Sequence, residues 1–299
     1  MKVLVDSHKV ITSAAANIRT GRDGYTWGAP VRESHILRGL GVVREVGGGR
    51  VDIDHRGLQA LGLREEDVIA ELWLASDDPT YRTMITLPGG SQVDLSTLLQ
   101  AYGQEILGEE HVFKYGPFLG TMMKYIDAHL SLTGQLHRIP GDPKGLAKPE
   151  VWKAGPGGAR LYFGWNKPMT PDTIRHHYRA GTLEGDFGVL NLFPGQLIQV
   201  PGGTVHAIRE GTYLKEWSHT PTAEDIALGD LKSATLSIWD RTDGKQPRPD
   251  KEQLEESIDA LRFAGPQAFV PPDSHQFTQQ PRILYTDQEG NGITTSASP

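Results

Sequence analysis

Four polar side chains along the sequence have the types and the spacing of metal ligands. Gln135 and His137 are two residues apart, and side chains two apart on a β-strand project to the same face. His206 follows a tight Pro-Gly turn that aims it inward, and Glu150 adds a carboxylate. Two imidazoles, one carboxylate and one amide oxygen suit Zn²⁺, and also Mn²⁺, Fe²⁺ or Ni²⁺. The residues therefore predict a metal site that leaves room for oxygens of a substrate.

The composition limits the classes of protein to consider. The 299 residues include 35 Gly and 20 Pro, which favours a turn-rich β protein over a helical bundle. There is no cysteine, so disulfides, thiolate metal ligands and a cysteine nucleophile are excluded. A net charge of −7 argues against nucleic-acid or anionic-membrane partners. No apolar run reaches the length of a membrane helix, and a cytoplasmic location is expected.

The spacing of apolar residues predicts the elements that position the ligands. Buried strands are predicted over 67–76 and 122–132, and helices over 94–107, 170–179 and 250–261. Between 186 and 217 the pattern changes to strands joined by Pro-Gly turns, which places His206 and Glu216 on consecutive strands of the chain.

Several of these stretches resemble known proteins. The run Gly195-x5-Pro201-x-Gly203-x2-His206 is similar to the second sequence motif of the cupin β-barrel superfamily. Together with Gln135-x-His137 and Lys148-x-Glu150, it resembles type I mannose-6-phosphate isomerases. Further segments that resemble this family, in its order, are Tyr25–Gly28, Ile69–Trp73, Met123–Ala128, Gly164–Asn166, Gly181–Gly185 and Ser237–Gly244.

The resemblance implies a mainly β fold, a cupin (jelly-roll-like) barrel with a few packed helices. The expected isomerase-like domain covers 1–265, with the metal-site core at about 120–245. A partly extended tail is expected over 266–299. The implied activity is a zinc-dependent isomerisation of mannose 6-phosphate to fructose 6-phosphate through an enediol, so the partner is a sugar or sugar-phosphate.

The resemblance also implies roles for individual residues. The implied zinc ligands are Gln135, His137, Glu150 and His206. The implied catalytic residues are Lys124, Lys148 and Glu216. Substrate binding is assigned to Lys215, Trp217 and Arg209, of which the tryptophan can stack on a sugar face. No oligomeric state is predicted.

One departure from the family keeps other functions open. The family has an arginine ten residues after the active-site Glu, where this chain has Ile226; an insertion would move the equivalent position to Ser237. The candidates to replace that arginine are Lys215, Arg209, Lys232 and Arg241. The alternatives are an isomerase-like enzyme for another, unphosphorylated sugar, or a non-catalytic cupin that binds metal and senses sugar.

Overall fold

The computed structural model of the protein describes residues 18–76, 83–87, 90–139, 142–145, 147–219, 235–239, 251–262, 280–286 and 292–297. The chain divides into two compact units, one of residues 1–127 with 217–227 and one of 128–216 with 228–299. Antiparallel strands outweigh helices among the described residues, so the predicted mainly β fold class is confirmed. The predicted division into a domain over 1–265 and a tail stays a prediction.

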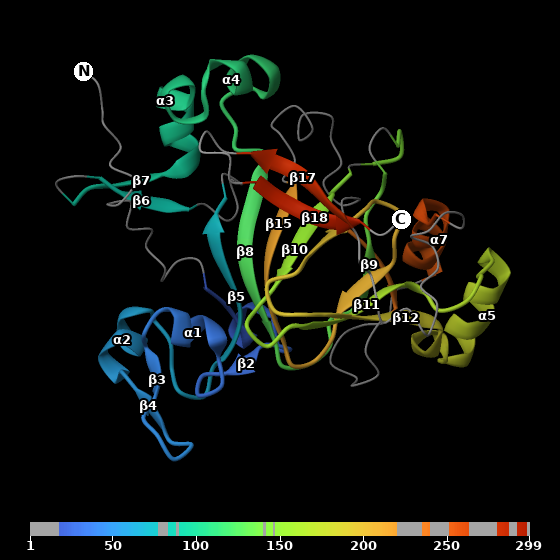
Figure 1. The fold of residues 1–299 in the computed structure, drawn as a ribbon, viewed down its shortest axis with the longest axis horizontal. Helices are drawn as coiled ribbons and strands as arrows, with labels where there is room; N and C mark the ends of the chain where they lie inside the picture. Colours follow the sequence, from blue (N-terminus) through green and yellow to red (C-terminus); the bar gives the residue numbers. More distant parts are fainter. Residues whose placement is uncertain are drawn as a thin grey trace. The chain divides into compact units, whose positions relative to one another are not determined.

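The first unit contains an antiparallel sheet in the order β1-β5-β8, with β2 paired to the start of β5 (Figure 1). Its strands are β1 (Ile18–Thr20), β2 (Ala29–Pro30), β3 (Val43–Glu45), β4 (Val51–Ile53), β5 (Val68–Ala75), β6 (Met84–Thr86), β7 (Gln92–Asp94) and β8 (Thr121–Ala128). Its helices are η2 (Gly21–Asp23), α1 (His35–Gly39), α2 (His55–Ala60), α3 (Leu95–Leu107) and α4 (Glu109–Tyr115). The predicted strand over 67–76 is therefore confirmed as β5.

Helix α3 shows how local sequence sets the bounds of an element. Asp94 precedes it in extended conformation, and its Oδ1 accepts the backbone N–H of Thr97 at 2.9 Å. Such a cap satisfies one of the N–H groups that have no partner within the helix. Gly108 ends the helix with a φ of 87°, a conformation that glycine adopts without strain. The helix predicted over 94–107 is confirmed.

The second unit contains two antiparallel sheets, in the orders β12-β11-β14-β9-β16 and β15-β10-β13. Its strands are β9 (Gly134–Leu136), β10 (Glu150–Ala154), β11 (Ala159–Trp165), β12 (Phe187–Leu192), β13 (Leu197–Val200), β14 (His206–Ile208), β15 (Thr212–His219), β16 (Leu236–Trp239), β17 (Gln280–Thr286) and β18 (Gly292–Ala297). Its helices are α5 (Pro171–Ala180), η3 (Leu183–Asp186) and α7 (Lys251–Ala260). Strands β17 and β18 pair with each other, within the predicted tail.

One face of the β9-containing sheet forms the hydrophobic core under α5 and α7, and both helices lie beside this sheet in Figure 1. Members of this core include Leu136, Tyr162, Ala207, Leu236 and Ile238 of the strands, Ile174 of α5, and Leu254 and Ile258 of α7. Because side chains alternate along a strand, Gln135 and His206 point to the opposite face of the same sheet. The helices therefore cover one side of this sheet, and the predicted ligands lie on the other.

The remaining observations concern the helices. The helices predicted over 170–179 and 250–261 are confirmed as α5 and α7. In the described part of the chain, no helix combines the length and the apolar character needed to cross a membrane.

Candidate metal centre

Three of the predicted ligands come together in the second unit. His137 directly follows β9, Glu150 begins β10 and His206 begins β14. Their ligand atoms all lie within 4.8 Å of one another, and all three side chains are buried. Glu150 Oε1 is 3.0 Å from His137 Nε2, and Glu150 Oε2 is 3.7 Å from His206 Nε2. Residues far apart in the sequence thus form one compact cluster of nitrogen and oxygen atoms.

The turn before His206 brings two of the ligand-bearing segments together. The N–H of Gly203 donates to the carbonyl of His137 at 2.6 Å. A Cβ at Gly202 would collide with the backbone of Arg138, and Gly203 has a φ of 78°. Only glycine meets both demands without strain, which is the physical reason for the Pro-Gly-Gly sequence at this turn.

A backbone carbonyl sets the proton position on His206. Its Nδ1 lies 2.9 Å from the carbonyl oxygen of Thr204, and since a carbonyl can only accept, Nδ1 carries the hydrogen. Nε2 then presents a lone pair, and among the described residues it has no hydrogen-bond partner. Burial, together with the nearby imidazole of His137, lowers the pKa of His206 to about 4. The ring is therefore neutral near pH 7, as a metal ligand must be.

Glu150 stays ionised although it is buried. Burial alone raises the pKa of this carboxyl, but the Lys148 ammonium and the two imidazoles outweigh burial and hold the pKa well below its usual range. Lys148 Nζ lies 3.0 Å from Oε1, and the indole N–H of Trp152 donates to Oε2 at 3.0 Å. Sequence reasoning missed the part of Trp152, although the Glu-x-Trp spacing on a strand was a visible signal.

A divalent cation fits this cluster on two observations. Two ligand atoms bound to one zinc ion at about 2.0–2.1 Å lie within about 4 Å of each other. The ligand atoms of the cluster all lie within 4.8 Å of one another, so they need to approach only slightly to bind one ion. The buried Nε2 of His206 also points its lone pair at the cluster without a hydrogen to donate. The identity of the metal is not fixed by these atoms, because nitrogen and carboxylate donors suit several divalent cations.

Gln135 lies next to this cluster in the sheet. It stands directly opposite His206 in the β14–β9 pair, so the two side chains are on the same face. Its amide nitrogen lies 3.3 Å from Thr133 Oγ1, as a donor to that hydroxyl, which leaves the amide oxygen for another contact. Its role as a fourth ligand stays a prediction.

The predicted residues on β15 separate onto two faces. Glu216 is buried, on the same face as the buried Leu214, in the strand beside β10. Lys215 points to the other face, and Lys153 likewise alternates with the buried Glu150 side of β10. Partial burial, with a contribution from Lys153, lowers the pKa of Lys215. Lys215 thus lies on the face of β15 opposite Glu216, and its substrate-binding role stays a prediction.

Arg209 also lies away from the cluster. Its guanidinium carbon lies 4.8 Å from the centre of the Tyr162 ring, and Nη2 lies 3.3 Å from Glu210 Oε1. Tyr162 belongs to the hydrophobic core on the helix-covered face, whereas His206 points to the opposite face. The predicted substrate-binding role of Arg209 stays a prediction.

The remaining predicted residues belong to the first unit or lie outside the described residues. Lys124 Nζ is 3.1 Å from Glu71 Oε1, and both side chains are buried. Trp217 is half-buried on β15. The positions considered for the family's arginine and its replacements at Ile226, Lys232 and Arg241 lie outside the described residues.

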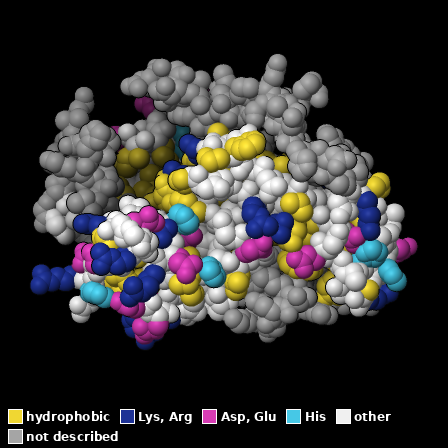
Figure 2. All heavy atoms as spheres, turned by 60° about the horizontal axis from the view of Figure 1, so that its bottom comes forward, with side chains coloured by type: hydrophobic (Ala, Val, Ile, Leu, Met, Phe, Trp, Pro, Cys, Tyr) yellow, Lys and Arg dark blue, Asp and Glu magenta, His cyan; other side chains and the backbone are white. Residues whose placement is uncertain are grey.

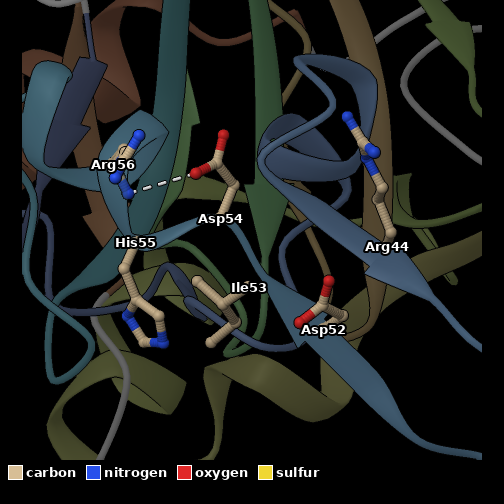
Figure 3. A pocket seen from close by; sticks show the side chains of 6 residues that line it. All are labelled: Arg44, Asp52, Ile53, Asp54, His55 and Arg56. Atoms are coloured by element: carbon tan, nitrogen blue, oxygen red, sulfur yellow. Dashed lines mark hydrogen bonds between the residues drawn. The ribbon is translucent and has the colours of Figure 1, made fainter.

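The first unit carries a surface pocket of about 390 Å³, shown in Figure 3. It is lined by Arg44, Asp52, Ile53, Asp54, His55 and Arg56. Asp54 already accepts the backbone N–H groups of Arg56 and Gly57, both at 3.1 Å, as the cap of α2, and His55 pairs with Glu65 at 3.4 Å. Figure 2 shows side chains of both charges interspersed on the face in view. Asp54 and His55 of the pocket thus have structural partners, whereas Nε2 of His206 in the second unit has no hydrogen-bond partner among the described residues.

The second unit combines antiparallel sheets with a buried His-Glu-His cluster, a candidate metal centre. Solved structures similar to this chain include mannose 6-phosphate isomerases. One from Bacillus subtilis is 16% identical, with a TM-score of 0.51 over 79% of this chain and 68% of the other. A variant of phosphomannose isomerase from Salmonella typhimurium is 13% identical, with a TM-score of 0.54 over 90% and 78% of the two chains. The predicted resemblance is therefore confirmed at the level of the fold.

Sequence comparison finds less. No protein-family model matches the chain, and no curated protein matches it.

Proposed function

We propose that the protein is a metal-dependent aldose–ketose isomerase that interconverts mannose 6-phosphate and fructose 6-phosphate. The observation that carries the proposal is the buried cluster of His137, Glu150 and His206. In this cluster, His206 Nε2 presents its lone pair toward the carboxylate of Glu150. The shared fold of the phosphomannose isomerases supports the choice of reaction. Zinc is the proposed metal, with Gln135 as the fourth ligand.

Neighbouring residues keep Glu150 and His206 in the protonation states that bind a cation. When bound, the metal supplies a Lewis acid that polarises sugar oxygens and stabilises charge that develops on them. Glu150 remains a carboxylate because Lys148 and the imidazoles surround it. His206 remains neutral and fixed in orientation because it donates to Thr204.

The proton transfer between C1 and C2 of the sugar requires a base within hydrogen-bond distance. Glu216 is our candidate, because it is a buried carboxylate on the strand beside β10, the strand that Glu150 begins. Lys148 lies beside the cluster at 3.0 Å from Glu150 and can donate to a substrate oxygen. Lys124 is a further candidate through the family resemblance, with its ammonium held by Glu71.

The test is conversion of mannose 6-phosphate to fructose 6-phosphate by zinc-loaded protein. We expect conversion by the unmodified protein and none above background for Glu150→Ala. Lys153→Ala is a matched control, because this exposed side chain alternates away from the Glu150 face of the same strand. Absence of conversion by folded, zinc-loaded protein would contradict the proposal.

One observation favours a second candidate, an isomerase for an unphosphorylated aldose. Lys215 alternates with Glu216 along β15, and the guanidinium carbon of Arg209 lies 4.8 Å from the centre of the Tyr162 ring, which favours a substrate without a phosphate. The same assay with mannose tests this candidate. Sugar binding without turnover of either sugar would instead indicate a sensing role. The cytoplasmic location and the absence of nucleic-acid and membrane partners stay predictions.

A further inference from the structure

A row of directly opposed side chains crosses the sheet from the buried cluster to its edge. His206 of β14 stands opposite Gln135 of β9, and Gln135 stands opposite Ser237 of β16. Directly opposed residues in antiparallel strands project to the same face. Ser237 therefore lies on the face that carries the candidate metal ligands, two strands or about 10 Å from His206.

The neighbours of Ser237 confirm which way it points. Leu236 and Ile238 are buried in the hydrophobic core beneath α7, so the residue between them faces the other side. Exposure also rises along the row, because His206 is buried whereas Gln135 and Ser237 are half-buried. The row thus leads from the ligand cluster toward the edge strand of the sheet.

The backbone at Ser237 is held in place independently of its side chain. The hydroxyl of Ser257, on α7, donates to the carbonyl of Ser237 at 3.0 Å, and Ser257 is buried. The side chain at position 237 is therefore presented from a fixed strand, and replacing it leaves this anchor intact. A short hydroxyl on a fixed backbone loses little entropy when it binds a ligand.

We propose that Ser237 is a specificity-determining residue that binds a hydroxyl of the sugar. Gln135 lies between Ser237 and His206 in the sheet. This inference rests on the proposed function of the site as a sugar isomerase. The row offers an amide and a hydroxyl, both uncharged, so it suits a sugar hydroxyl, which both donates and accepts, rather than a phosphate. The contacted hydroxyl is one that mannose and mannose 6-phosphate share.

The experiment compares Ser237→Thr with Ser237→Val in the zinc-loaded full chain. These two side chains have nearly the same shape, and only threonine keeps a hydroxyl. Calorimetric titration with mannose and with mannose 6-phosphate gives the dissociation constants. We expect Ser237→Val to weaken the binding of both sugars by the same factor of about 3 to 10, the size of one neutral hydrogen bond, relative to Ser237→Thr. Zinc affinity, measured by chelator competition, stays unchanged in both.

Three outcomes overturn the inference. Equal sugar affinity of the two variants shows that no hydroxyl contact exists, and an effect confined to mannose 6-phosphate shows a contact with phosphate. A change in zinc affinity shows that the residue acts on the metal ligands instead. Because binding is measured without turnover, a protein that binds sugar but does not isomerise it contradicts the proposed function and still decides the role of Ser237. Failure of the unmodified protein to bind either sugar contradicts both.

Discussion

The buried carboxylates of Glu71 and Glu150 are held in the same local way in the two units of the molecule. In the first unit, Trp73 follows Glu71 by two residues, and its indole N–H donates to Oε2 at 2.6 Å. Lys124, on the neighbouring strand, places its ammonium 3.1 Å from Oε1. One oxygen thus takes an indole and the other takes an ammonium.

In the second unit, the indole of Trp152 donates to Glu150 Oε2 at 3.0 Å, and Lys148 lies 3.0 Å from Oε1. The difference is the pair of imidazoles of His137 and His206, which lie beside both oxygens. An ammonium and an indole N–H can only donate hydrogen bonds, so the arrangement around Glu71 is an ion pair with one added hydrogen bond. Nε2 of His206 carries no hydrogen and can only be used by a cation or a donor, so the two histidines turn the same carboxylate arrangement into a candidate metal centre.

The largest expected effect is on the ion pair of the first unit. Lys124→Met leaves the Glu71 carboxylate buried without its ammonium, and we expect a loss of about 3–5 kcal/mol in the free energy of unfolding. Lys148→Met should cost less than half of that in metal-free protein, because Lys148 is more exposed, at 19% against 11%, and its charge is therefore better screened by water. Urea unfolding measures both, and equal losses would show that the greater exposure of Lys148 does not weaken its ion pair.

A smaller effect is expected from the metal itself. Free zinc at 100 times its dissociation constant should raise the free energy of unfolding by about 2.7 kcal/mol in a protein that binds it only when folded. Glu71→Gln should keep this increment, and His206→Ala should abolish it. Thermal or urea unfolding with and without zinc gives the comparison. Loss of the increment in Glu71→Gln would place the metal elsewhere.

The smallest effect separates the two indoles. Trp152→Phe removes a hydrogen bond to a metal-ligating carboxylate, and we expect zinc affinity to fall by at least about tenfold. Trp73→Phe removes the equivalent hydrogen bond from Glu71 and should leave zinc affinity unchanged. Competition with a chromophoric chelator measures both variants. Equal zinc affinities in the two variants would contradict the supporting role of Trp152.

Much of the candidate site could be predicted from local sequence. The Pro-Gly-Gly turn, the Gln-x-His pair and the Lys-x-Glu pair identified residues that the fold brings together, because each pattern is a local constraint on a strand or turn. The alternation of side chains along a strand also indicates the positions of Arg209 and Lys215. Arg209 lies three residues after His206, and Lys215 precedes Glu216, so each falls on the opposite face of its strand.

Other parts of the site could not be read from the sequence. The Thr204 carbonyl that orients His206 is a backbone group, present at every position, and only the turn geometry aims it at the ring. The placement of Ser237 beside Gln135 depends on the register of two strands far apart in the chain, which no local pattern determines.

The helix α7 gives the candidate centre an order of assembly. The N–H of Arg262, just after this helix, donates to the carbonyl of Gly203 at 2.9 Å, and Asp259 pairs with Lys144 at 2.8 Å. During synthesis, every proposed ligand leaves the ribosome before these contacts can form, since the chain emerges from its N-terminus. The turn that carries His206 gains this hydrogen bond only when α7 docks, so its set of contacts is completed after every proposed ligand has been synthesised.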